Sequence, residues 1–382
     1  FDDFNSTRFR PAYLALKDLA DNGRNGLGTV VVQSAGNSFS LGDDTNLHNF
    51  QNSRYIVTVA ATNYSGDVSG FSSQGASILV SAPGGGGGDI YSGGYLGEIL
   101  TSDRAGSSGY SQFDYYFISG TSFSAPVVSG VVALMLEANP SLGYRDVQLI
   151  LAYSARQISS SENEWRYNGA KNLNGGGLHY DAVTHNLGFG MVDALAAVRL
   201  AETWTGVPQT SENVTEVYAS LTQPVAIPDD SLISQRISID EDIIVERVEL
   251  KVDISHTYIG DLAILLKSPS GTNSWMLWKP GASDQSPYGT AQNNIDFTFN
   301  TVLSMGESSV GIWELTIFDL QTGDVGSLKS WSLNIVGRND DDDDTFFYTN
   351  EFSEALIAEG SRATLADTSG IASLNASMVT SA

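Results

Sequence analysis

The first half of this chain contains continuous apolar runs, and these limit its fold more than any other feature. The runs TVVVQ at 29–33 and YIVTVAA at 55–61 are typical of parallel strands buried on both faces of a sheet. Helical patterns lie at 12–22 and from residue 122 onward. We therefore expect residues 1–203 to form an α/β domain in which a parallel sheet packs against buried helices.

The second half has a different pattern. After a polar stretch at 204–213, which predicts a linker, apolar and polar residues alternate, which indicates half-buried antiparallel strands. The alternating apolar residues are Val248, Leu250, Val252 and Ile254, then Trp313, Leu315 and Ile317, then Trp331, Leu333 and Ile335. Gly, Pro and Asp turns separate the runs, so we expect residues 214–338 to form an all-β jelly-roll sandwich.

A run of five aspartates at 340–344 follows the sandwich. Like charges repel one another, so such a run is typical of a solvated linker. The remaining residues mix aromatic and small side chains without an evident pattern. The sequence thus predicts that residues 339–382 are an acidic linker and the start of a further module.

Charge and composition exclude several classes of function. The formal net charge of −25 would repel nucleic acid and anionic membranes, and it favours cations such as metal ions or basic substrates. The chain has no cysteine, which excludes disulfides, thiol catalysis and cysteine-ligated metals. It also lacks a run of about 18 uninterrupted apolar residues, so we expect no membrane span.

Ser122 lies in the sequence GTSFSAP, at the start of an apolar helix. A serine hydroxyl becomes a nucleophile only when a base takes its proton and donors stabilise the resulting oxyanion. Helix N-terminal N–H groups favour negative charge there, and Asn37, in the turn after a buried strand, could donate its side-chain amide. The alternative is structural, because Thr121 or Ser122 could simply cap the helix.

Several motifs together resemble one family. GTSFSAPVVSGVVALMLEANP, preceded by the turn SAGN, resembles the subtilisin-like serine proteases, and THNLGFGMVDA resembles the end of their catalytic domain. The stretches HTYIGDLAILLKSPSGT and GIWELTIFDLQTGDVGSLKSWSLNIVG resemble the P domain of the kexin and furin branch. The resemblance implies a serine endopeptidase that hydrolyses protein or peptide substrates. Ser122 would be its nucleophile, Asn37 its oxyanion-hole amide, and Ser34, Ala35 and Gly36 would contact substrate.

The catalytic base expected from the resemblance is not evident. In that family the aspartate and the histidine of the triad precede the serine, and none of the four histidines of this chain has the expected context. The chain is therefore interpreted as the C-terminal portion of a catalytic domain, with the triad aspartate and histidine upstream of it. The alternative is a catalytically inactive relative that uses the β-sandwich to bind a partner.

The same resemblance implies calcium and a pocket for basic side chains, but the match is partial. Asp2 or Asp3, and Asp43, fall near family carboxylates and are the candidate calcium ligands, with Asp44 beside them. His48 stands at the place of a further pocket aspartate, and Ser73 or Gln74 at that of a glutamate. A substrate preference broader than paired basic residues is therefore expected. We also expect a monomer that is secreted by a bacterium or displayed on its surface.

Overall fold

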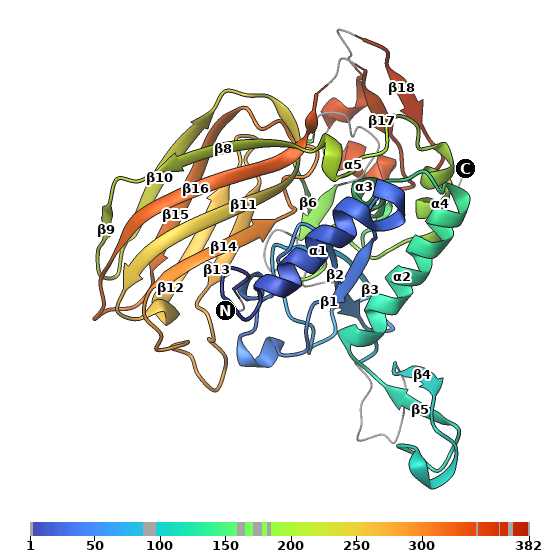
Figure 1. The fold of residues 1–382 in the computed structure, drawn as a ribbon, viewed down its shortest axis with the longest axis horizontal. Helices are drawn as coiled ribbons and strands as arrows, with labels where there is room; N and C mark the ends of the chain where they lie inside the picture. Colours follow the sequence, from blue (N-terminus) through green and yellow to red (C-terminus); the bar gives the residue numbers. More distant parts are fainter. Residues whose placement is uncertain are drawn as a thin grey trace.

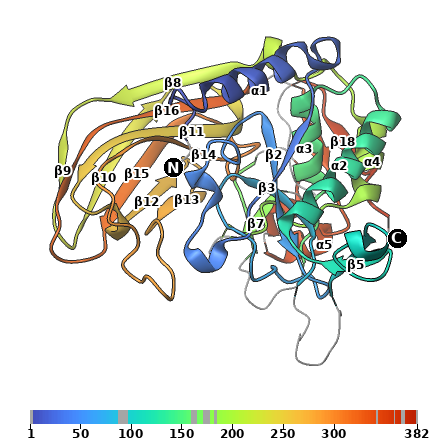
Figure 2. The ribbon, with the colours of Figure 1, turned by 60° about the horizontal axis from the view of Figure 1, so that its bottom comes forward.

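The computed structural model describes residues 3–86, 97–158, 165–170, 178–181, 185–340, 343–358, 360–365 and 370–380. An α/β part and a β-sandwich lie side by side (Figure 1, Figure 2), and the last described residues fold against the α/β part. Both expected architectures are present.

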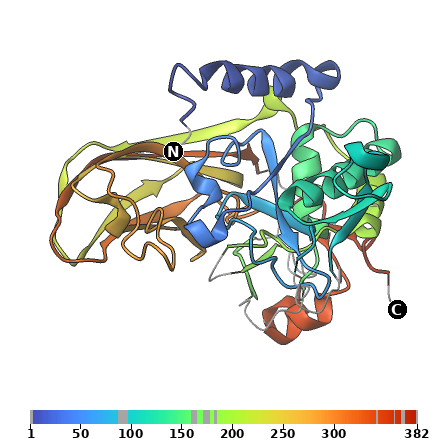
Figure 3. The ribbon, with the colours of Figure 1, turned by 90° about the horizontal axis from the view of Figure 1, so that it is seen from below.

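The α/β part has a three-stranded parallel sheet in the order β1-β2-β3. All seven residues of β2 are buried, as its apolar run predicts. One helix, α2, packs on all three strands and on α4, whereas α1 lies on the outside of the molecule (Figure 3). The elements are α1 (Arg10–Asn22), β1 (Val31–Ser34), β2 (Ile56–Thr62), β3 (Ile78–Pro83), β4 (Ile99–Ser102), β5 (Tyr115–Ile118), α2 (Thr121–Ala138), α3 (Tyr144–Ser154), β6 (Trp165–Tyr167), β7 (His179–Asp181) and α4 (Ala194–Thr203).

Two helices differ from the sequence-based expectation. The helix α2 was expected to be buried all round, but only one face is, and Val127 and Leu134 are exposed. It is long and apolar enough to cross a membrane by length and composition alone, yet here it packs on a sheet as a core helix does. Every residue of α3 is buried, because β3, α4, the stretch at 204–213 and a side chain of the sandwich all contact it.

The sandwich consists of two antiparallel sheets. One has the strand order β10-β15-β12-β13 and the other β14-β11-β16-β8, with β9 also paired to β16. The alternation seen in the sequence is confirmed, since Leu250 and Leu333 face each other across β11 and β16 and are fully buried in the core between the sheets. The strands are β8 (Thr215–Leu221), β9 (Val225–Ile227), β10 (Leu232–Ile239), β11 (Ile243–His256), β12 (Leu262–Lys267), β13 (Asn273–Trp278), β14 (Ile295–Thr301), β15 (Gly311–Asp319) and β16 (Gly326–Asn339).

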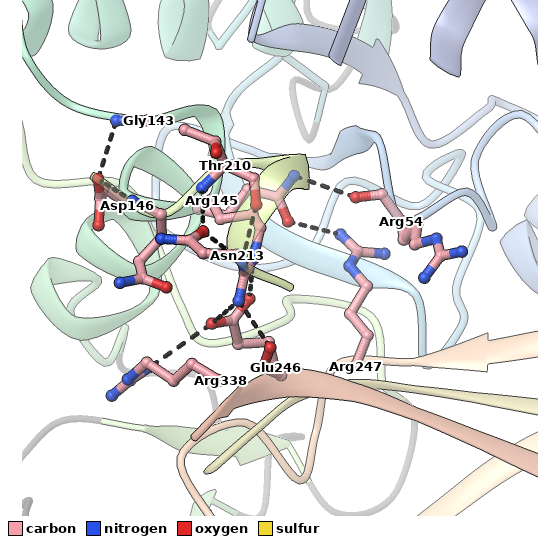
Figure 4. Close-up of polar contacts among 12 residues, drawn as sticks. Arg54, Gly143, Arg145, Asp146, Thr210, Asn213, Glu246, Arg247 and Arg338 are labelled. Atoms are coloured by element: carbon pink, nitrogen blue, oxygen red, sulfur yellow. Dashed lines mark hydrogen bonds and ion pairs between the residues drawn. The ribbon is translucent and has the colours of Figure 1, made fainter. Parts of the chain in front are cut away.

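The two parts share a core and a polar interface. Val302, Leu303 and Met305, between β14 and β15, are buried within the core of the α/β part. On the other side of the interface, the side chain of Arg145 on α3 donates to both carboxylate oxygens of Glu246 on β11 at 2.7 and 2.8 Å, and both side chains are buried (Figure 4).

The stretch predicted as a linker, 204–213, is docked along α3. The side chain of Asp146 accepts from the main-chain N–H of Gln209, and Arg145 donates to the carbonyl of Thr210. Its position is therefore fixed by the same helix that binds the sandwich.

The tail after the sandwich also packs on the α/β part. It comprises β17 (Thr345–Phe347), α5 (Phe352–Ala358) and β18 (Ser373–Asn375), and β17 pairs in parallel with β18. The ring of Phe347 stacks on Trp204 at 5.6 Å, and Met378 is buried in the same core. The boundary at residue 339 stays a prediction, but hydrophobic contacts cross from the tail to α3 and α4.

Candidate active site

Ser122 and Asn37 come from two elements that meet at one end of the sheet. The strand β1 ends at Ser34, and the chain turns through Ala35 and Gly36 to Asn37. Ser122 is the second residue of α2, whose N-cap is Gly120. Both Ser122 and Asn37 are exposed, so a substrate can reach them.

Thr121 holds the side chain of Asn37 in one orientation. The Oδ1 atom of Asn37 accepts from the main-chain N–H of Thr121 at 2.9 Å and from its Oγ1 at 2.8 Å. Two donors on one atom identify it as the oxygen, so the Nδ2 group of Asn37 points away from Thr121. The amide is thus positioned by the residue next to Ser122, and it keeps its N–H donors for another acceptor.

Two glycines have backbone conformations that other residues rarely adopt. Gly120 has a φ of +151°, although a Cβ there would make only an ordinary contact with Asn37 Nδ2, at 3.5 Å. Gly36 has a φ of +115°, and a Cβ there would lie 2.8 Å from Ser73 Oγ, closer than such contacts allow. Both positions therefore require glycine.

The helix start favours negative charge near Ser122. The helix also contains a proline, Pro126. It lies inside the helix, four residues after Ser122. Because Pro126 has no N–H, the carbonyl of Ser122 lacks its usual helical donor.

The other predicted substrate residues differ in exposure. Ser34 and Gly36 are half-buried, whereas Ala35 is fully buried against Ala60 and Ile78. Only the main chain of Ala35 could therefore contact a substrate.

The predicted calcium ligands do not form a metal site in the part of the chain that the structure describes. No group of three or more His, Asp or Glu side chains there could hold a metal ion. Asp43 is bonded to other side chains: its Oδ1 lies 2.7 Å from His48 Nε2, and its Oδ2 accepts from Ser73 Oγ at 2.9 Å. Asp3 accepts from the N–H of Asn5 in its own segment. Asp2 lies outside the described residues. The oxygens proposed for calcium at Asp43 are thus already engaged.

The negative charge of Asp43, near the turn at residues 34–37, is compensated by a neighbouring side chain of the protein. Burial opposes ionisation of Asp43, but the hydrogen bond and charge of His48 outweigh it and hold the pKa of Asp43 below its usual range. Burial raises the pKa of the neighbouring Asp44 to about 7. Sequence reasoning placed His48 and Ser73 at positions of family carboxylates, but it did not detect that both would bind Asp43.

None of the four histidines is placed as a base for Ser122. His48 binds Asp43, and His256 lies 3.2 Å from Asp319, a buried carboxylate of the sandwich. His185 Nε2 accepts from the N–H of Trp275, and His179 is fully buried, with burial lowering its pKa to about 3. The location of the catalytic histidine outside this chain stays a prediction.

Comparisons with known proteins agree with this architecture. The profile of the subtilase family matches residues 4–190, and that of the proprotein convertase P-domain matches residues 245–335. Among curated relatives, the proprotein convertase subtilisin/kexin type 6 of Rattus norvegicus is 33% identical over 336 residues, which cover 82% of this chain and 32% of that protein. The dibasic-processing endoprotease of Schizosaccharomyces pombe is 31% identical over 341 residues, covering 85% of this chain and 43% of that protein. The chain therefore spans less than half the length of these relatives.

A solved structure, the serine protease of Aeromonas sobria, superposes with a TM-score of 0.73 at 22% identity, over 88% of this chain and 69% of that one. At that identity the likeness bears on the fold, and it includes both the α/β part and the sandwich. The chain belongs to the subtilase family, in the kexin-like group whose members carry a proprotein convertase P-domain.

Proposed function

We propose that this chain is the serine-bearing part of a secreted serine endopeptidase that hydrolyses peptide bonds in protein substrates through an acyl-enzyme. Ser122 Oγ attacks the carbonyl, and the Nδ2 group of Asn37, with main-chain N–H groups at the start of α2, stabilises the oxyanion. The observation that carries the proposal is the double hydrogen bond from Thr121 to Asn37 Oδ1, because it orients the amide beside an exposed serine.

The proton of Ser122 must go to a base. We propose that this base, the histidine of the triad, and the triad aspartate belong to a segment outside this chain. Two surfaces support this. The strand β1 is an edge strand whose four residues are only half-buried, and α2 exposes apolar residues beside it. A groove of about 460 Å³ between α2 and α4, lined by Leu134, Leu195 and Val198 among others, continues this apolar surface.

The side chains near the SAGN turn (residues 34–37) favour substrates that need not carry paired basic residues. A buried lysine or arginine side chain needs a carboxylate partner, and Asp43 already has His48 and Ser73. The name of the S. pombe relative describes dibasic processing, but for this chain we propose a broader preference. Calcium binding is retained as a family-based expectation without an assigned site, as is the monomeric state.

A second candidate function is a catalytically inactive subtilase-like protein that binds partners through its sandwich. The observation that favours it is that all four histidines are engaged away from Ser122. The two proposals differ in whether Ser122 reacts.

Fluorophosphonate labelling of the full-length protein tests both. We expect labelling of wild type, none of Ser122→Ala, and a 10²- to 10³-fold lower kcat for Asn37→Ala, the typical effect of removing one oxyanion donor. Equal labelling of wild type and Ser122→Ala would refute the assignment of the nucleophile. A wild-type protein that neither labels nor cleaves β-casein would favour the binding protein.

A further inference from the structure

The hairpin formed by β4 and β5 carries exposed aromatic side chains and leads directly to Ser122. We name it the aromatic hairpin (residues 99–118). It extends away from the body of the molecule, at the lower right of Figure 1. Tyr110, Phe113 and Tyr115 are 82%, 51% and 45% exposed, an unusual exposure for three neighbouring aromatic residues.

The rings form an ordered surface. Phe113 stacks on Tyr115 with ring centroids 5.2 Å apart and planes 10° apart, and Tyr115 meets Phe117 edge-on at 5.9 Å. On the neighbouring part of the hairpin, Tyr110 lies 5.8 Å from Tyr116. Aromatic surfaces of this kind bind apolar and aromatic side chains with little loss of side-chain entropy.

Hydrogen bonds fix the tip that carries these rings. Asp103 accepts from the main-chain N–H groups of Arg104 and Ser111, both at 2.8 Å, and the Ser111 N–H bond holds the pKa of Asp103 below its usual range. Ser111 Oγ donates to the carbonyl of Tyr115 at 2.7 Å. The surface is thus preorganised although it is exposed, which lowers the entropic cost of binding.

The base of the hairpin is joined to the candidate active site. Gly120, the N-cap of α2, donates its N–H to the carbonyl of Gly84 at 2.8 Å, just beyond the end of β3. Only Ser119, Gly120 and Thr121 separate β5 from Ser122. At about 3.3 Å per residue, Phe117 is within roughly 17 Å and Tyr115 within roughly 23 Å of Ser122 along the chain. A bound polypeptide that extends about seven residues beyond its scissile bond could therefore reach Tyr115, on which Phe113 stacks.

The hairpin is a two-stranded sheet in which β4 and β5 pair with each other. An extended peptide that lies along the hairpin would bring alternate side chains into contact with the exposed rings. Chain continuity with Ser122 favours the substrate itself as the occupant.

We propose that the aromatic hairpin is an exosite that binds an extended segment of the protein substrate, rich in aromatic or aliphatic side chains, several residues away from the scissile bond. The proposal rests on the proposed proteolytic function. It predicts selectivity for long, unfolded polypeptides over short peptides.

The test uses the full-length enzyme. A bond that the enzyme cleaves in β-casein is mapped by mass spectrometry, and two peptides are synthesised around it, with two and with eight residues on each side. The variant is Tyr110→Ser, Phe113→Ser and Tyr115→Ser combined. The matched control is Tyr218→Ser with Tyr288→Ser, which removes two similarly exposed aromatic side chains from the sandwich.

We expect kcat/KM for the long peptide to fall about tenfold in the hairpin variant, through KM, and for the short peptide to change less than twofold. The control should cleave both peptides like wild type. Phe113→Ser alone should reduce cleavage of the long peptide about threefold, which keeps the test valid if the triple variant is unstable.

Equal losses for both peptides would mean that the rings support the fold or are covered by another part of the protein, and this would overturn the exosite. An unchanged KM for the long peptide would overturn it as well. If wild-type cleavage does not depend on Ser122, the proteolytic proposal fails first and the exosite falls with it. If cleavage depends on Ser122 but not on the hairpin, only the exosite is refuted.

Discussion

Replacing Glu246 by glutamine should destabilise the whole molecule, because Glu246 joins its two parts. Its carboxylate forms a two-fold hydrogen-bonded ion pair with Arg145, and the two side chains are only 8% and 4% exposed. Removing one partner of a buried pair typically costs about 3–5 kcal/mol, since the other charge stays buried without compensation. Arg145 keeps the carbonyls of Thr210 and Gly337 as acceptors, so we expect the lower end, about 3 kcal/mol.

The assay is urea unfolding followed by tryptophan fluorescence, with hydrogen exchange of peptides from β2 and β11 to report on each part separately. Both peptides should lose protection together in wild type and in Glu246→Gln, because the parts share a core. The matched control is Arg236→Gln, which breaks an exposed pair with Glu314 and should cost less than about 1 kcal/mol. The reasoning is refuted if Glu246→Gln costs no more than this control, or if only the sandwich peptide loses protection.

Two further predictions concern buried carboxyl groups. Burial raises the pKa of Glu351, which lies 3.4 Å from the buried His179, to about 7. Because the pKa of Glu351 is higher in the folded than in the unfolded state, its protonated form stabilises the folded protein. This contribution to the free energy of unfolding is complete below the pKa of the unfolded chain, near 4.5, and is lost as the pH rises to about 7. In Glu351→Gln, the melting temperature should therefore decrease less steeply with pH between about 4.5 and 7 than in wild type. An unchanged slope would contradict the raised pKa of Glu351. His48→Asn removes the partner that lowers the pKa of Asp43. It should cost about 1 kcal/mol at pH 6, and this cost should shrink as the pH falls below the unfolded pKa, near 3.8, and Asp43 becomes protonated in the folded state; urea unfolding at a series of pH values from 6 downwards checks this.

Short-range patterns predicted the elements correctly, whereas long-range contacts were not predictable. The alternation through Leu250 and Leu333 placed both residues in the core of the sandwich, because period two fixes which side chains share a face. The apolar character of α2 suggested complete burial, but composition does not reveal how many elements cover a helix. The burial of α3 depends on Glu246, a residue 101 positions away in the sequence, and no local pattern encodes that contact.

In the candidate site, too, local motifs predicted some residues, whereas contacts between distant residues were not predictable. The pairing of the SAGN turn with the GTS helix led to the prediction of Asn37 and Ser122, which stays a prediction, and the structure places both at the same end of the sheet. The role of Thr121 in orienting Asn37 was missed, although the motif contains it, since a threonine before a helix is ordinarily interpreted as a cap. The link between Asp43 and Ser73 joins two loops 30 residues apart, so Asp43 was assigned to calcium instead.

The arrangement of α2 and α3 explains how the sandwich can affect a serine that it does not touch. The helix α2 carries Ser122 at its start and ends at Ala138, and the next residue, Asn139, donates to the carbonyls of Ala201 and Trp204 beyond its far end. Five residues separate α2 from α3, whose Arg145 is held by the sandwich. Without the sandwich, α3 would expose a face that includes Arg145, whose buried partner Glu246 would be lost. A less stable α3 would in turn weaken the packing at the C-terminal end of α2. We therefore expect the sandwich to act on the candidate site through the stability of these two helices, and its loss to unfold the α/β part rather than to alter the contacts of Asn37 alone.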